Sequence, residues 1–403
     1  MRTVSQHLAE CLKLVAPLPP LEVMLPDATG CVVAEDVRSP INLPVADLAG
    51  CDGYAVAARD TVGAATDSPV VLSVIDEIRA GSMDATAIVP GTAVRIASGA
   101  PLPSGADAVL ALEHTNMGVE TVDIYSEAFA GMNVRACGQD VAAGDIIVHE
   151  GERVGARQIA LVAGVGRNRL SVHPHPRVVV VSIGDELVEP GQPATPGAVY
   201  DANGHALAAA VADAGAMTFR VAAVPDEHRR LRETIEDQLV RADLIITTGG
   251  LSYSAGDTVK EVLAPLGTIR FDEIAMFPGK QMGVGTVGEG TPIFCLPGDP
   301  VAAQVAYEMF VRPALRHMGA WNELYRTTIE AKVDKAWQSP VGKREFVRVR
   351  VTGSPREGYR AEVIDNPQNL HLSTLARANA LAVVPENVTQ VNVGDKLFCL
   401  ALD

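Results

Sequence analysis

Apolar residues follow two contrasting patterns along this chain. Between about residues 17 and 150, short Val- and Ile-rich runs such as 70–74 and 93–96 alternate with Gly and Pro. Runs of this kind are typical of strands joined by tight turns, so this region is predicted to be mostly β. Near residue 178 the pattern changes, because 178–183 is apolar at positions that would face both sides of a strand. Such a run is typical of a parallel strand buried on both faces.

The stretch that follows alternates predicted strands and helices. Strands are expected at 178–183, 218–224, 244–248, 268–276 and 292–296, and helices at 203–214, 227–241, from about 256, and at 301–317. In the helix at 227–241, Leu231, Ile235 and Leu239 recur at spacings of four and would share one face. This alternation predicts a doubly wound α/β domain, in which ligands bind beyond the carboxyl ends of the strands.

The two ends of the chain have patterns of their own. Residues 5–16 are expected to form a short helix with Ser5 as its cap. Its apolar stripe would hold Leu8, Leu12 and Val15. Towards the C-terminus, alternating positions such as 344–351 predict a small β domain. The expected fold class is therefore α/β plus β, with a central α/β domain, β-rich N-terminal domains and a small C-terminal β domain.

The amino-acid composition argues against several classes of function. Of the 403 residues 48% are apolar and 20% charged, which is the balance of a folded globular protein. Lys and Arg number 33 against 49 Asp and Glu, and the net charge of −16 disfavours binding to nucleic acid or anionic membranes. No run of about 18 apolar residues, the length of a membrane span, occurs. The six cysteines are scattered and form no CxxC pair, so we expect reduced cysteines and a cytoplasmic protein.

Three predicted strand ends in the α/β domain finish in short polar or Gly-rich sequences, at 182–187, 247–252 and 296–300. Adjacent parallel strands end on the same rim of a sheet, so we expect these loops to lie together. Glycine lets backbone N–H groups approach an oxyanion, and a helix start adds partial positive charge. The candidate ligand-binding residues in these loops are Gly184, Asp185, Thr248, Gly249, Gly250, Ser252, Pro297 and Gly298.

Carboxylates on the same rim of the predicted sheet indicate a binding site for a metal cation. Asp185, Glu186 and Asp257 provide the oxygen ligands that Mg²⁺ prefers, and the cation would hold a phosphate group against the loops. The sequence 278–280, Pro-Gly-Lys, places a basic group nearby. Residues 283–288 also fit the pattern GxGxxG, but no helix follows them, so a dinucleotide-binding loop is excluded.

Residues 51–56, Cys-Asp-Gly-Tyr-Ala-Val, resemble the MDGYAV signature of the MoeA/gephyrin family of molybdenum insertases. The resemblance continues in family order through 95–101, 138–144, 182–187, 200–203, 248–257, 278–280 and 296–298. The expected C-terminal β domain also stands where this family has one.

The resemblance implies a homodimer of four-domain subunits. Residues 1–46 and 138–175 would form a discontinuous dimerisation domain, with 47–137 as an inserted β domain that carries the DGYAV motif. Residues 176–318 would form a molybdopterin-binding-like α/β domain, and 319–403 the C-terminal β domain. The active site would lie between the α/β domain of one subunit and the DGYAV domain of the other.

The resemblance also implies a reaction. Adenylylated molybdopterin and molybdate would be the substrates, Mg²⁺ the cofactor, and AMP a product. By position in the family motifs, the catalytic residues would be Asp52, Ser98 and Asp140 from one subunit and Glu186, Asp226, Asp257 and Lys280 from the other. Arg344 and Ser373 would add contacts from the C-terminal domain, and Glu186 and Asp257 would be the Mg²⁺ ligands.

The chain departs from the family pattern at three informative positions. Phe277 stands where a second lysine is usual, Ile183 replaces a threonine, and Asp299 replaces an asparagine. Each change removes a hydrogen-bond donor or adds negative charge where an anionic substrate should bind. Loss of one donor to a developing oxyanion typically costs roughly 10²–10³ in rate. A second hypothesis therefore stays open: a gephyrin-like scaffold dimer, with weak or lost catalysis, that binds short segments of a membrane receptor or of a cytoskeletal or cell-division protein.

Overall fold

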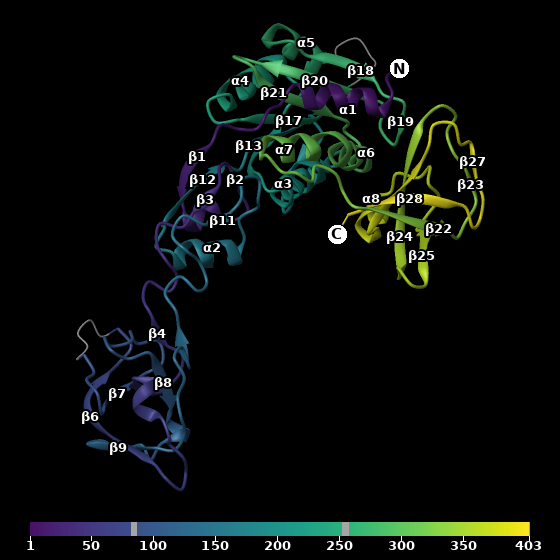
Figure 1. Cartoon of the computed structure of the whole chain (residues 1–403). Coiled ribbons are helices and arrows are strands. Elements are labelled where there is room, and N and C mark those ends of the chain that lie inside the picture. The colour runs from purple at the N-terminus through teal and green to yellow at the C-terminus, as the bar shows by residue number, and fades with distance from the viewer. Residues whose placement is uncertain (82–86, 252–257, 403) are drawn as a thin grey trace. The chain divides into compact units, whose positions relative to one another are not determined.

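The structure is a computed structural model that describes residues 1–81, 87–251 and 258–402 (Figure 1). The chain divides into two compact units, one of Met1–Leu21, Gly30–Ala34 and Val172–Asp403, and one of Glu22–Thr29 and Glu35–Ser171. Each unit is described by itself. The division is coarser than the four predicted domains, whose boundaries stay a prediction. No helix among the described residues is both long and apolar enough to cross a membrane.

The first unit is built on a six-stranded sheet with the order β16-β13-β17-β21-β20-β18. Its strands are β13 (Arg177–Ile183), β16 (Met217–Val224), β17 (Leu244–Gly249), β18 (Arg270–Glu273), β20 (Gln281–Val287) and β21 (Thr291–Leu296). The first four strands in this order run parallel, whereas β20 pairs antiparallel with both β21 and β18. The predicted strands are confirmed, and the parallel core lies where the apolar runs indicated.

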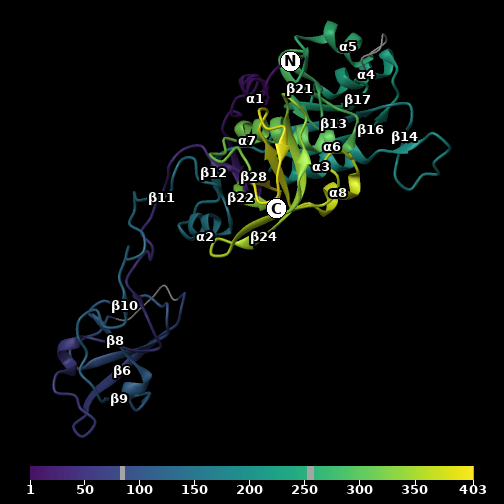
Figure 2. The same cartoon turned by 90° about the vertical axis from the view of Figure 1, so that its right-hand side faces the viewer.

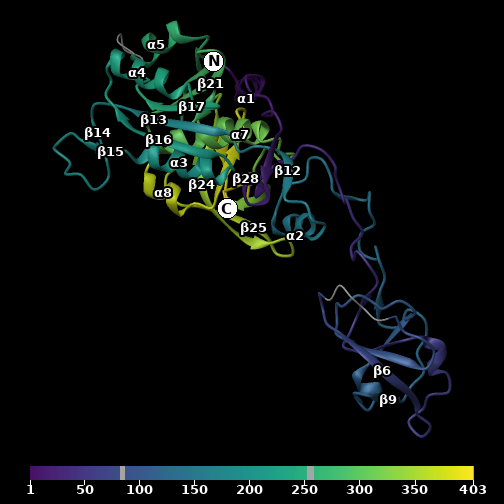
Figure 3. The same ribbon diagram turned by 90° about the vertical axis from the view of Figure 1, so that its left-hand side faces the viewer.

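Both faces of this sheet are covered by helices. The helices are α1 (Val4–Lys13), α3 (Ala202–Asp213), α4 (His228–Gln238), α5 (Thr258–Leu263), α6 (Pro300–Ala306) and α7 (Arg312–Met318), with a π-helical turn at Tyr307–Val311 between the last two. Val178 and Val180 join one apolar core with α1, α3 and α6–α7, while Val179 and Val181 join another with α4 and α5. Figures 2 and 3 show α3 and α4 on opposite sides of β13. The domain is doubly wound, as predicted.

Strand β20 is an element that the sequence analysis missed. It contains the GxGxxG match, and its glycines serve packing rather than ligand binding. A Cβ at Gly283 would lie 2.5 Å from the Phe271 ring, and one at Gly285 would lie 2.5 Å from the Ile269 Cα. The neighbouring chain therefore passes too close for side chains at these positions, which confirms the exclusion of a dinucleotide-binding loop.

The small C-terminal domain is a closed barrel. Its strands β22 (Thr328–Val333), β24 (Arg344–Ser354), β25 (Gly358–Val363), β26 (Ala380–Val384) and β28 (Lys396–Ala401) have the order β24-β25-β22-β28-β26, and β26 pairs back onto β24. Strand β19 (Met276–Phe277), from the α/β domain, pairs in parallel with the first residues of β24, Arg344 and Glu345. The minor elements are β23 (Trp337–Gln338), β27 (Gln390–Val391) and α8 (Leu372–Arg377).

The second unit carries the DGYAV motif in a five-stranded sheet with the order β8-β5-β7-β6-β9. These strands are β5 (Gly53–Val56), β6 (Val70–Ile78), β7 (Thr92–Ile96), β8 (Ala108–Ala111) and β9 (Thr121–Ile124). Across both units the remaining strands and α-helix are β1 (Leu21–Met24), β2 (Val32–Val33), β3 (Val37–Arg38), β4 (Leu48–Ala49), β10 (Val134–Arg135), β11 (Ile146–Val148), α2 (Ala156–Gly164), β12 (Arg169–His173), β14 (Leu187–Val188) and β15 (Val199–Tyr200). Short 3-10 helices lie at Leu25–Ala28, Ala58–Thr61, Leu112–His114 and Ala264–Leu266. The predicted β-rich character of this region is confirmed.

The N-terminal helix differs from the prediction at its cap and on its buried face. Thr3, not Ser5, is the N-cap: its hydroxyl accepts from the Gln6 N–H at 3.1 Å, and the Gln6 side chain accepts from the Thr3 N–H at 3.0 Å. This reciprocal capping box satisfies two backbone donors at once, which Ser5 inside the helix cannot do. The fully buried stripe consists of Val4, His7 and Cys11, while Leu8 and Leu12 are only partly buried.

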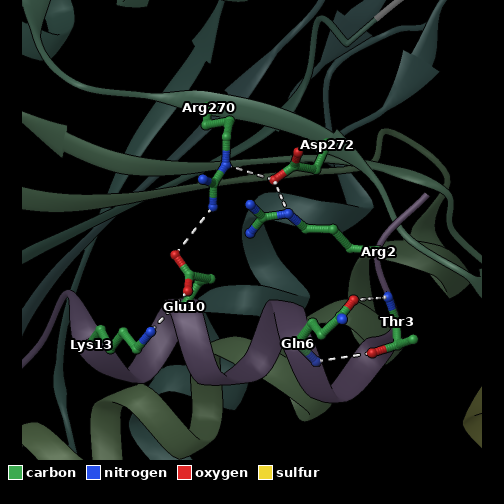
Figure 4. A network of polar contacts seen from close by, with 7 residues as sticks. All are labelled: Arg2, Thr3, Gln6, Glu10, Lys13, Arg270 and Asp272. Carbon is green, nitrogen blue, oxygen red and sulfur yellow. Dashed lines mark hydrogen bonds and ion pairs between the residues drawn. The ribbon is translucent and has the colours of Figure 1, made fainter.

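A charged network fastens α1 and the residues before it to the edge of the sheet (Figure 4). Asp272 on β18 contacts Arg2 at 3.2 Å and Arg270 at 2.9 Å, and Arg270 reaches Glu10 on α1 at 3.3 Å. The Arg2 backbone adds two hydrogen bonds, donating to the Glu273 carbonyl and accepting from the Ala275 N–H. Side-chain and backbone contacts together therefore fix the start of the chain on the segment that leads into β19.

His7 is the buried polar residue of this helix. It is 1% exposed, its ring meets Phe310 edge-on at 4.7 Å, and its Nδ1 has no hydrogen-bond partner among the described residues. Burial lowers the pKa of His7 from 6.5 to about 4, because the charged ring would lose its hydration.

We predict that His7 makes the fold acid-sensitive. Between pH 6.5 and about 4 the unfolded chain binds a proton at His7 and the folded chain does not. Stability is therefore full above pH 6.5 and falls through this window, by on the order of 3 kcal/mol. Urea unfolding from pH 7 to 4 should show a shallower pH dependence for His7→Leu than for the wild type. The exposed His114→Gln is the control; equal slopes for all three proteins would contradict the prediction.

Candidate functional site

The three predicted loops meet in one pocket. It has a volume of about 100 Å³ and lies at the carboxyl ends of β13, β17 and β21. Its lining residues are Ser182, Ile183, Glu186, Leu187, Val199, Tyr200, Asp201, Ala202, Asn203, Thr248, Gly249, Gly298 and Pro300. The start of α3 is the one part of this lining to which the sequence analysis gave no function. We call this cavity the strand-end pocket.

Asp201 organises one wall of the strand-end pocket from a buried position. Its carboxylate caps α3 by accepting from the Gly204 N–H at 2.8 Å and also accepts from the Ser182 hydroxyl at 2.8 Å. The Arg220 guanidinium lies 3.2 Å from the same carboxylate and 2.7 Å from Glu189. Because Asp201 is only 1% exposed, these donors stabilise its charge in place of water.

Asn203 connects the other walls of the strand-end pocket to one another. Its side-chain NH₂ group donates to the Thr248 hydroxyl at 2.9 Å and to the Gly298 carbonyl at 2.8 Å. The Thr248 hydroxyl in turn donates to the Pro297 carbonyl at 2.8 Å. One amide thus ties the start of α3 to the loops after β17 and β21. Sequence reasoning missed this role because the partners lie 45 and 95 residues away.

The carboxylates of the first loop are exposed. Glu186 lines the strand-end pocket, and a Cβ at Gly184 would lie 2.6 Å from its carboxylate, so a larger residue there would displace the Glu186 side chain. Asp185 does not line the pocket, and its carboxylate accepts from the Asp226 N–H at 2.9 Å. Asp226 is thereby brought to this loop through its backbone. Glu186 is the described carboxylate best placed to meet a cation bound with a phosphate ligand.

Two predicted site residues, Ser252 and Asp257, lie outside the described residues. Within the ranges 1–81, 87–251 and 258–402, no group of three His, Cys, Asp or Glu side chains is arranged to hold a metal ion. Mg²⁺ commonly takes only one or two carboxylates and completes its shell with substrate phosphates and water. A site with Glu186 as one ligand fits that chemistry.

Lys280 lies in a turn that packs against the third loop, residues 296–300. A Cβ at Gly279, which has φ +89°, would lie within 4 Å of Pro297 and Ala302. The Lys280 ammonium is 3.0 Å from the Glu273 carboxylate, and both side chains are about two-fifths exposed. An anionic ligand that uses Lys280 has to compete with Glu273 for it.

The three residues that depart from the family pattern lie in different surroundings. Phe277 is half-buried in β19, opposite Glu345 of β24. Ile183 belongs to the apolar core under α4 and α5 and is 2% exposed. Asp299 caps α6 by accepting from the Ala302 N–H at 2.8 Å, so its charge faces the positive end of a helix.

Arg344 and Ser373 are not among the described residues that line the strand-end pocket. Arg344 pairs with Glu386 at 3.2 Å, and Ser373 is exposed on α8. Gly250 and Pro297 belong to the converging loops without lining the pocket, and Gly250 has a φ of +66°. A Cβ at Gly250 would lie 2.5 Å from a Val259 methyl group, which excludes any larger residue.

The remaining predicted residues belong to the second unit. The Asp52 carboxylate accepts from the Ser98 N–H at 2.7 Å, so this pair is brought together. Asp52 lines a pocket of about 180 Å³ beside Arg95 and Glu77. Asp140 lines a different pocket, of about 240 Å³, beside Arg135. Within this unit the three residues therefore form two separate groups.

We predict that Asp201 is the main stability determinant of the strand-end pocket. Asp201→Ala removes the α3 cap and leaves the Ser182 hydroxyl and Arg220 short of a partner, at a cost of about 2–3 kcal/mol. Chemical denaturation measures the loss. The matched control is Glu189→Ala, which removes the more exposed partner of Arg220 and should cost clearly less. Equal losses in the two variants would contradict this assignment.

Comparison with known proteins gives a consistent result along the whole chain. Residues 2–166 match the MoeA N-terminal region (domain I and II), residues 179–317 a probable molybdopterin binding domain, and residues 330–400 the MoeA C-terminal region (domain IV). Molybdopterin molybdenumtransferase 2 of Mycobacterium tuberculosis H37Rv is 40% identical over 98% of both chains. Molybdopterin molybdenumtransferase of Nostoc sp. PCC 7120 is 34% identical over 93% of this chain and 87% of its own.

Among solved structures, the molybdopterin biosynthesis MoeA protein of Pyrococcus horikoshii superimposes with a TM-score of 0.82 at 30% identity, covering 100% of this chain and 99% of that chain. The multidomain fold and the family resemblance are both confirmed. The chain belongs to the MoeA family of molybdopterin molybdenumtransferases.

Proposed function

We propose that this chain inserts molybdenum from molybdate into adenylylated molybdopterin and releases AMP. Membership of the family makes it a transferase of molybdenum cofactor biosynthesis. The observation that carries the finer proposal is the strand-end pocket, which lies inside the segment matched as a probable molybdopterin binding domain. We place this reaction in the cytoplasm.

The residues of the pocket suit an anionic, phosphate-bearing ligand. Gly249 and Gly298 let the backbone approach the ligand, and Thr248 holds the third loop in place by donating to the Pro297 carbonyl. Glu186, together with Asp257, would hold Mg²⁺, which supplies positive charge to the pyrophosphate group. Lys280 offsets charge that develops as AMP leaves. Asp52, Ser98 and Asp140 would complete the site from the partner subunit of a homodimer.

The scaffold alternative has no comparable support. The relatives named above are transferases, and nothing in them favours a gephyrin-like peptide-binding role.

The direct test is AMP release by the purified protein with Mg²⁺, molybdate and adenylylated molybdopterin. We expect AMP to form only when all three are present. The control omits molybdate, which separates molybdenum insertion from simple hydrolysis of the pyrophosphate. A folded protein that releases no AMP under these conditions would overturn the proposed function.

We predict that Lys280 carries the catalytic positive charge alone, because position 277 offers none. Lys280→Ala should lower the rate of AMP release by roughly 10²–10³, and Phe277→Lys should raise it, by up to roughly 10². Phe277→Met is the matched control, since it keeps an apolar side chain in β19. A gain with Met equal to that with Lys would show that charge is not the cause.

We also predict a homodimer whose sites use both subunits. Asp52→Ala and Glu186→Ala should each be inactive alone. When the two are mixed and allowed to exchange subunits, half of the dimers are hybrids with one intact site each, so about one quarter of wild-type activity should return. Light scattering reports the assembly state. A monomer, or no recovery despite exchange, would count against a shared site.

A further inference from the structure

The Asn203 amide is held in one orientation by its two partners. A backbone carbonyl such as that of Gly298 only accepts hydrogen bonds, so it must face the NH₂ group. The single hydroxyl proton of Thr248 goes to the Pro297 carbonyl, so the Thr248 oxygen also accepts from Asn203. The side chain is 91% buried, and its Oδ1 has no partner among the described residues. Asn203 therefore acts here as a double donor.

The two loops that Asn203 ties together pass very close to each other. A Cβ at Gly298 would lie 3.4 Å from the Gly249 Cα. Gly249 itself has a φ of +85°, and a Cβ there would lie 2.2 Å from the Ile183 carbonyl. These glycines have little intrinsic conformational preference, so their backbones need an external restraint to stay in one arrangement. Among the described residues, the hydrogen bonds from Asn203 to the Thr248 hydroxyl and to the Gly298 carbonyl connect the two loops.

We propose that Asn203 is a positioning residue that fixes the spacing of the Gly249 and Gly298 loops, and thereby the shape of the anion-binding pocket. It touches protein carbonyl and hydroxyl groups and acts on the ligand through them. Only the expected loss of AMP release rests on the proposed function. Its structural consequence, rigid loops, is measurable without turnover.

The discriminating variant is Asn203→Asp, which keeps size and shape but removes the NH₂ group. A carboxylate would face the Gly298 carbonyl, an acceptor, and could not restore the link. Asn203 is the second residue of α3, where a negative charge favours the helix. Faster exchange of the two loops, measured without ligand, therefore reports the lost link and not a weakened helix. The activity of this variant also reflects the negative charge that it adds to an anion-binding pocket.

Two further variants test the link itself. Thr248→Val removes the hydroxyl with nearly unchanged volume, and Thr248→Ser keeps it. If Asn203 and Thr248 act as one unit, the double variant Asn203→Asp/Thr248→Val should be no worse than the worse single variant. Asn379→Asp is the matched control, because Asn379 also donates to a buried carbonyl, that of Val351, in the C-terminal barrel.

The experiment measures hydrogen exchange by mass spectrometry in peptides covering 246–251 and 296–300, and AMP release in the same preparations. For Asn203→Asp we expect at least tenfold faster exchange in both peptides and a fall in kcat of roughly 10–10², with Asn379→Asp unchanged at both readouts. Thr248→Ser keeps the hydroxyl and should leave the exchange of both peptides near that of the wild type. Unchanged exchange in Asn203→Asp, or strictly additive effects in the double variant, would overturn the proposal. If Asn203→Asp exchanges faster but the wild-type protein itself releases no AMP, the proposed function is refuted and the positioning role still stands.

Discussion

Burial of the parallel strands on both faces is the constraint on which the rest of this structure depends. Val178–Val181 on β13 give alternate side chains to two separate apolar cores, one under α1, α3 and α6–α7 and one under α4 and α5. A strand used in this way has no surface left for polar chemistry along its length. Polar groups therefore lie at the strand ends, where the loops after β13, β17 and β21 converge.

The walls of the strand-end pocket are held by two polar networks of different character. Asp201 gathers a hydroxyl, a helix N-terminus and a guanidinium around one buried charge. Asn203 uses a neutral amide to connect loops that are distant along the chain. The first network stabilises a wall, and the second sets a distance between walls.

The sequence was sufficient where structure follows from local pattern. The apolar run at 178–183 and the glycine-rich strand ends predicted both the parallel core and the meeting of the three loops. It was insufficient where a residue's role depends on distant neighbours. The burial of His7 depends on Phe310, 303 residues away, and no strand was predicted at the glycines of β20, whose side-chain space Phe271 occupies. The function of Asn203 depends on partners that no local pattern reveals.

The pairing of β19 with β24 has a consequence for how this protein changes over evolutionary time. Met276 and Phe277 are the last residues before the turn that carries Lys280, yet both pair with β24 of the C-terminal barrel. Removal of the barrel would leave this short strand as an unpaired edge, directly before the turn that carries Lys280. The barrel is therefore no exchangeable appendage. Substitutions at the start of β24 act on the backbone before this turn as well as on the barrel, so the two segments are constrained together.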